Sequence, residues 1–108
     1  MQTMINSLAI VQAHGSLNAS NAKAFQVRLL EQIQHNHASE LAVDMSQVDS
    51  LDSAGLIALV AALKHARQRS KRLYLCAVPP AIRIVFELTQ LDRAFEMLEE
   101  VPQLAVAA

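Results

Sequence analysis

Residues 41–59 read LAVDMSQVDSLDSAGLIAL and place three kinds of segment in direct succession. Residues 40–45 form a brief apolar run, which is typical of a strand covered on both faces. Residues 46–52 are rich in side chains that cap backbone N–H groups, which predicts a turn-rich loop. Residues 54–63 are apolar on all sides, which predicts the most buried helix of the chain. We therefore expect a strand, a loop at its carboxyl end, and a helix.

Weaker signals of the same kind flank this segment. We expect further strands over residues 8–13, 73–78 and 94–98, and helices over residues 22–34 and 80–89. His14-Gly15 predicts a turn, residues 99–102 predict another, and residues 103–108 predict a fraying helix. The alternation predicts one α/β domain over residues 1–108, frayed at 1–5 and 103–108. Its sheet should be mostly parallel, with four to five strands and three to four packed helices.

Composition narrows the classes of partner. The formal charge is −1, from nine basic and ten acidic residues, and only 4% of residues are aromatic. A surface of that kind favours protein partners over nucleic acid or anionic lipid. The apolar run over residues 54–63 has roughly half of the ~20 residues that cross a bilayer, so we expect no membrane insertion. With a lone cysteine and an N-terminus that does not resemble a secretion signal, the chain is expected in the cytoplasm.

Ser53 stands where the predicted buried helix begins. Backbone N–H groups in the first turn of a helix lack intrahelical partners, so a phosphate on Ser53 would find hydrogen-bond donors and a favourable dipole there. Asp52 is placed to cap the same helix. The small residues Ala54 and Gly55 should leave the backbone open to an approaching kinase.

The quoted stretch resembles the phosphorylation loop and helix of STAS domains, the fold of bacterial anti-sigma-factor antagonists. The resemblance continues in Gly15-Ser16-Leu17-Asn18-Ala19-Ser20-Asn21-Ala22 and in Leu88-Thr89-Gln90-Leu91-Asp92-Arg93-Ala94-Phe95, so it spans residues 8–98. Two residues depart from the common pattern. Asn18 stands where many members have an aspartate, and Ala54 stands where members often carry a second hydroxyl.

The resemblance implies a phosphorylation-switched interaction module. A serine kinase that doubles as an anti-sigma factor would phosphorylate Ser53, and a metal-dependent serine/threonine phosphatase would remove the phosphate. The unmodified domain would bind and sequester the kinase. The expected partner-binding residues are Asn18, Asp49, Ser50, Asp52, Ser53, Ala54, Gly55 and Leu56. The sequence leaves homodimerisation open. An alternative is an adaptor subunit of a membrane transporter or sensory assembly, in which Ser53 would only cap its helix.

Other chemistry finds less support in the sequence. Asp44 could imitate the phosphoacceptor of a receiver domain, but such domains need an acidic pair after their first strand, and Asp44 is expected to cap a loop instead. The basic run over residues 64–72 is expected to be a solvated helix end. Cys76 is expected to be a buried small hydrophobe. The histidines lack zinc spacing, and we find no nucleophile, base and acid set, so we expect no metal, no cofactor and no enzyme activity.

Overall fold

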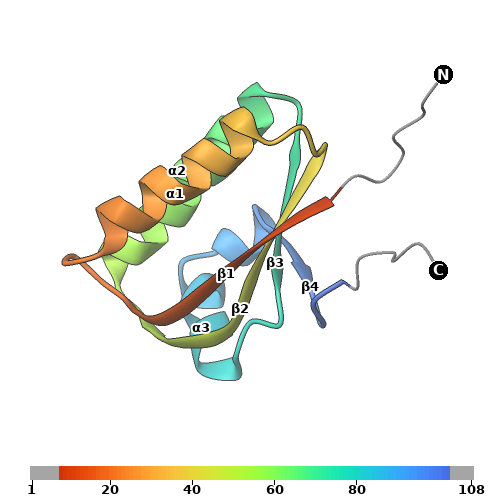
Figure 1. The fold of residues 1–108 in the computed structure, drawn as a ribbon. Coiled ribbons are helices and arrows are strands. Elements are labelled where there is room, and N and C mark those ends of the chain that lie inside the picture. Colours follow the sequence, from red (N-terminus) through yellow and green to blue (C-terminus); the bar gives the residue numbers. More distant parts are fainter. Residues whose placement is uncertain (1–7, 103–108) are drawn as a thin grey trace, which may run out of the picture.

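Four parallel strands form one sheet in the order β1-β2-β3-β4, and helices connect them along the chain (Figure 1). The computed structural model describes residues 8–102. Its elements are β1 (Leu8–Leu17), α1 (Ala22–His35), β2 (Glu40–Leu51), α2 (Ser53–Gln68), β3 (Arg72–Cys76), α3 (Pro80–Leu88), the 3-10 helix η1 (Leu91–Arg93) and β4 (Glu96–Leu98). The predicted α/β class and parallel sheet are confirmed. The predicted fraying at 1–5 and the helix over 103–108 lie outside the described residues.

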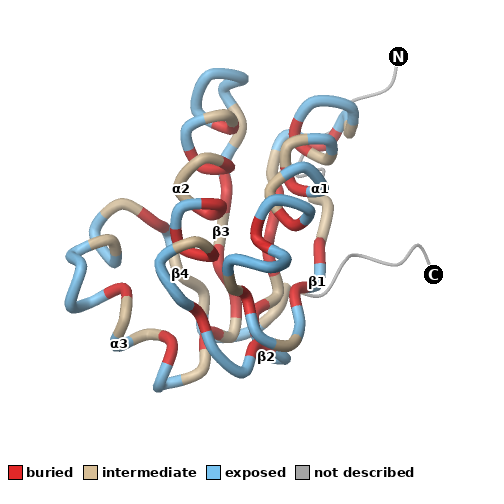
Figure 2. The backbone as a smooth tube through the Cα atoms, turned by 90° about the vertical axis from the view of Figure 1, so that its left-hand side faces the viewer, coloured by how far each residue is buried: buried red, intermediate tan, exposed pale blue. Residues whose placement is uncertain are grey.

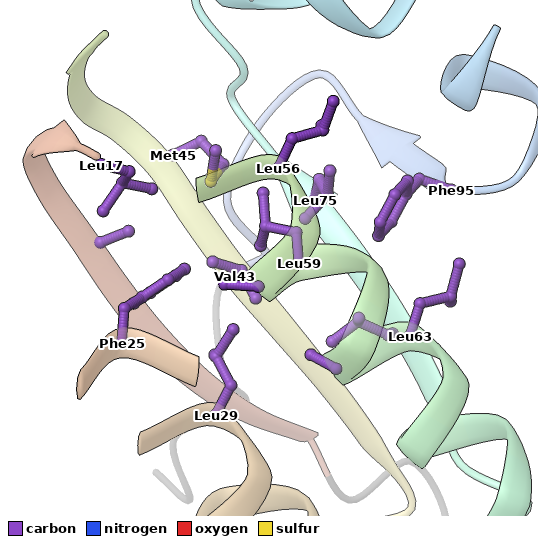
Figure 3. Close-up of a cluster of buried hydrophobic side chains, with 14 of the residues drawn as sticks. Leu17, Phe25, Leu29, Val43, Met45, Leu56, Leu59, Leu63, Leu75 and Phe95 are labelled. Carbon is purple, nitrogen blue, oxygen red and sulfur yellow. The ribbon is translucent and has the colours of Figure 1, made fainter. Parts of the chain in front are cut away.

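The three α-helices pack on one face of the sheet. Alternate strand residues such as Val43 and Leu75 point toward the helices and join Leu29 of α1, Leu59 of α2 and Phe86 of α3 in one core. Figure 3 shows part of this core between the sheet and α2, and Figure 2 shows the buried sides of α1 and α2 facing the strands. The molecule thus has two layers in its described part.

The opposite face of the sheet carries no helix within residues 8–102, yet Ala42 and Cys76 are fully buried on it. This face carries Glu40, Asp44 and Tyr74, all partly exposed. Ala42 is fully buried on it because its small side chain lies between its cross-strand partners Ile10 and Tyr74.

The largest difference from the sequence prediction concerns residues 46–52. Residues 46–51 are strand, and they pair with β1 as far as Leu17 and Leu51. His14 and Gly15 lie inside β1 at irregularities of the register and do not form a turn; Gly15 adopts a positive φ of 76° there. These irregularities change the burial rhythm of β2. Met45, Val48 and Leu51 are buried three residues apart, which hides the alternation that marks a strand.

The end of β3 and the start of β4 also differ from the sequence prediction. β3 ends at Cys76, before the predicted Val78, where Ala77 takes a positive φ of 53°. β4 begins at Glu96 because η1 and Phe95 occupy the preceding residues. The start of α3 at Pro80 is confirmed, with Ile82 and Phe86 buried. No described helix combines the length and the apolar character that crossing a membrane requires.

Candidate functional site

A single residue, Asp52, separates the end of β2 from the start of α2. Its backbone N–H donates to the carbonyl of Leu17 at 3.0 Å, which ties the junction to the end of β1. Its Oδ1 accepts hydrogen bonds from the N–H groups of Ala54 at 2.9 Å and Gly55 at 3.1 Å. The predicted helix cap is therefore present. The side chain of Asp52 and its backbone together fix the position of Ser53.

Ser53 is the first residue of α2 and is exposed. Its hydroxyl forms no hydrogen bond with any residue in the described part of the chain. One expectation needs correction. The first-turn N–H groups of Ala54 and Gly55 already bond Asp52, so they are not vacant for a phosphate. A phosphate on Ser53 would instead add negative charge beside a carboxylate.

Gly55 and Leu56 lie beneath the surface of the site, on the side of α2 that faces the sheet. Both are buried. A Cβ on Gly55 would lie 2.7 Å from the carbonyl oxygen of Leu17 and 2.7 Å from a methyl carbon of Leu51. The expected role of Gly55 in opening the backbone to a kinase is thus wrong. Its small size lets α2 approach the ends of β1 and β2 closely.

The loop between β1 and α1 borders this junction. The side-chain oxygen of Asn18 accepts hydrogen bonds from the backbone N–H of Ser20 at 2.9 Å and from its hydroxyl at 2.6 Å. Asn21 accepts from the backbone N–H of Asn18 and donates to the carbonyl of Ser16. Asn18 directly follows Leu17, whose carbonyl bonds Asp52. The structure therefore places Asn18 beside the Asp52 turn, as a tied and partly exposed loop residue.

Asp49 and Ser50 lie in β2 and not in the predicted loop, but both are exposed. Ser50 is paired with Ser16 of β1, close to the loop that holds Asn18. Asp49 and Asp52 give this surface two exposed carboxylates. The expected site residues thus divide into an exposed group and a buried pair. The exposed or partly exposed ones are Asn18, Asp49, Ser50, Asp52, Ser53 and Ala54.

Sequence reasoning missed Ile57. The all-apolar run over residues 54–63 predicts burial on every side, but Ile57 is 64% exposed. It lies one helical turn after Ser53 on the same face of α2. A signal was present in the sequence, because Ser53, Ile57 and Lys64 follow helical spacing on the side opposite to Leu59.

The described surface also has a cavity of about 250 Å³ between β1 and α1. Arg28 and Asn21 line it, but they donate to the carbonyls of Gln12 and Ser16. These bonds cover backbone groups along the outer side of β1. The polar side chains are therefore engaged with the strand, in the manner of a protected sheet edge.

The alternative sites of the sequence analysis have structural roles. Asp44 lies within β2, where it accepts from the N–H of Ser46 at 2.9 Å, so it does not cap a loop. Burial, with a smaller effect of the Asp44 carboxylate, raises the pKa of the Cys76 thiol to about 11. Among residues 8–102, no group of three or more His, Cys, Asp or Glu side chains could hold a metal ion.

The basic run over residues 64–72 is bonded to the fold more than its expected role as a solvated end implies. Lys71 donates to the carbonyls of Ile33 and Asn36 at the end of α1. Arg67 donates to the carbonyl of Ala94 at 3.0 Å, and Arg72 forms an ion pair with Glu96 at 2.6 Å. These cations hold elements together at the far end of α2.

Comparison with known families identifies the fold. A family model described as the STAS domain matches residues 2–104. The chain belongs to the STAS domain family. A relative from Bordetella bronchiseptica, named "Putative anti-sigma factor antagonist BtrV", is 29% identical over 85 residues, which cover 79% of this STAS domain and 72% of the relative.

Solved structures share the fold at lower identity. An anti-sigma factor antagonist from Mycobacterium paratuberculosis has a TM-score of 0.75 at 24% identity, covering 94% of this chain and 83% of that one. The phosphorylated form of the Bacillus cell fate determinant SpoIIAA has a TM-score of 0.65 at 14% identity, covering 89% and 86%. A sulfate transporter family protein from Wolinella succinogenes has a TM-score of 0.76 at 14% identity, covering 93% and 83%.

Proposed function

We propose that this STAS domain is a phosphorylation-switched anti-sigma-factor antagonist. In its unphosphorylated form it binds a serine kinase that also acts as an anti-sigma factor. The kinase phosphorylates Ser53, and a serine/threonine phosphatase restores the hydroxyl. The observation that carries the proposal is the exposed Ser53 hydroxyl, which bonds no described residue and is held at the first residue of α2 by the Asp52 cap. The domain works in the cytoplasm and supplies a surface and a phosphoacceptor, while the catalytic groups belong to its partners.

The switch rests on charge. Phosphorylation adds about −1.5 to −2 charges at neutral pH. That charge arrives beside the carboxylate of Asp52, with Asp49 exposed on the neighbouring strand. The N–H groups that could neutralise it, on Ala54 and Gly55, already bond Asp52. A partner that covers Ser53 would therefore have to desolvate a phosphate that lies beside a carboxylate, and binding weakens.

Charge-mimicking variants test the switch. The probe is the purified serine kinase of the same genome that transfers phosphate to Ser53. We expect Ser53→Ala to bind it as tightly as the wild type, and Ser53→Glu to bind at least about tenfold more weakly. Gln68→Glu is the control, because it adds one negative charge at an exposed residue near the other end of the same helix. Equal binding of Ser53→Glu and wild type contradicts the proposal.

A second candidate is an adaptor subunit of a membrane transporter or sensory assembly. The likeness of the fold to the sulfate transporter family protein favours it. In that role Ser53 keeps its hydroxyl, and only the cap formed by Asp52 matters. Intact-mass measurement of the protein from its native cells separates the two. A phosphate on Ser53 supports the switch, and its absence under every growth condition supports the adaptor.

A further inference from the structure

Ile57 is an exposed apolar residue on the helix that carries Ser53. Its 64% exposure contrasts with Leu56, Leu59 and Leu63 of the same helix, which are buried in the core. Residues four apart on a helix lie on one face, with Cβ atoms about 5–6 Å apart. Any partner surface that covers Ser53 therefore reaches Ile57.

The fold gains little from an isoleucine at this position. The helix buries the opposite face, and β-branched residues are weaker helix formers than alanine, by up to about 0.7 kcal/mol. An exposed isoleucine thus contributes neither core packing nor helix propensity. Ile84 and Leu88 of α3 are also exposed, at 52% and 80%, but Ile57 is the one of these exposed residues that lies on α2, one helical turn from Ser53.

The side chains next to Ile57 on the surface of α2 are small or partly buried. On the helix surface its neighbours are Ser53, Ala54, Val60 and Ala61, at three or four residues' distance. Ala54, Val60 and Ala61 are partly buried, so Ile57 rises above them as a single apolar projection. Such a projection fits a pocket on a partner, as anchor residues of protein interfaces do.

We propose that Ile57 is the apolar anchor by which the kinase that binds this site recognises it. The inference rests on the proposed function and names how that partner is held. The partner presents an apolar pocket for Ile57, with basic side chains toward Asp52 and Asp49, because the carboxylates of these two residues are exposed on this surface. When the partner's pocket closes over Ile57, it also excludes water from the neighbouring Ser53. Anchor and phosphoacceptor are therefore recognised together, and a phosphate prevents the closure.

Paired truncations of exposed β-branched residues test the anchor. The measurement is the Kd, by calorimetry, for the purified serine kinase of the same genome that phosphorylates Ser53. We expect Ile57→Ala to raise Kd at least about tenfold, as truncation of an anchor does. Val27→Ala is the matched control, because Val27 is 43% exposed on α1, and it should change Kd less than about twofold. Ile57→Val should retain most of the affinity.

The result separates the anchor from the switch. If Ile57→Ala binds like the wild type while Ser53→Glu binds weakly, the anchor is overturned and the proposed function stands. An equal loss with Val27→Ala also overturns it, because the effect would then not be specific to the Ser53 face. If Ser53→Glu binds normally while Ile57→Ala binds weakly, the anchor is supported and the switch is lost. Thermal unfolding guards against misfolding, and Ile57→Ala should melt no lower than the wild type.

Discussion

At the scale of single residues, Asp52 determines the geometry of the site. It is the only residue between β2 and α2, and it bonds both the end of β1 and the first turn of α2. The cap and its neighbour Ser53 could be predicted from the sequence, because both depend on local chemistry. The close contact of Gly55 with Leu17 could not, because it depends on where α2 lies against β1.

Replacing the cap tests the role of Asp52. We expect Asp52→Ala to lower the free energy of unfolding by about 1 kcal/mol, because two first-turn N–H groups lose their acceptor. Asp52→Asn should lose less, since an amide oxygen also accepts. Urea denaturation measures both. Asp49→Ala, an exposed carboxylate on β2, should stay within about 0.5 kcal/mol of the wild type, and a loss as large as that of Asp52→Ala would argue against a specific cap.

Gly55→Ala tests the close approach of α2 to the strands. Alanine favours a helix by about 1 kcal/mol over glycine. We nevertheless expect a net loss of about 1–3 kcal/mol, because the new Cβ would meet the backbone oxygen of Leu17 at 2.7 Å. Ser53→Ala in the same turn should change stability by less than about 0.5 kcal/mol. A Gly55→Ala protein more stable than the wild type would show that the space between α2 and Leu17 can hold an additional methyl group.

Cys76 should make stability depend on alkaline pH. Burial raises the pKa of its thiol from 9.0 to about 11, so the unfolded chain loses this proton at a lower pH than the folded chain. The stabilisation is complete below pH 9 and is lost between about pH 9 and 11, on the order of 2 kcal/mol. Urea unfolding against pH should show a shallower decline for Cys76→Ala. Equal slopes for the two proteins would contradict the prediction.

At the scale of elements, helical spacing predicted α1 and α3, and an apolar run after capping residues predicted α2. The alternation of strands and helices predicted the parallel sheet. The second half of β2 escaped prediction for a physical reason. Polar residues such as Ser46 and Asp49 resemble a turn, and buried residues three apart resemble no strand. Only the register irregularities against β1 explain this rhythm, and they depend on residues more than 30 positions away in sequence.

Hydrogen exchange tests the extension of β2. We expect the N–H groups in residues 46–51 that donate to β1 to exchange at least about tenfold more slowly than that of Ala19, an exposed residue of the loop before α1. The neighbouring β3 pairs only with residues 40–44, so this protection must come from β1. Exchange as fast as that of Ala19 would mean that residues 46–51 form the loop that their composition suggests.

At the scale of the whole molecule, the sheet brings the site together from separate segments. The ends of β1 and β2 lie side by side, so the Asn18 loop and the Asp52 turn meet at one edge. The cations of residues 64–72 that bond to the fold lie at the opposite end of α2. Near Ser53 the carboxylates of Asp52 and Asp49 are exposed, and a phosphate on Ser53 adds to their negative charge.

The most direct measurement compares two forms of the same protein. The domain is phosphorylated to completion on Ser53, and the Kd of each form for the serine kinase is determined by calorimetry. We predict that the phosphorylated form binds at least about tenfold more weakly, a difference of about 1.4 kcal/mol, and that phosphatase treatment restores the affinity. Equal affinity of the two forms would contradict a switch at Ser53.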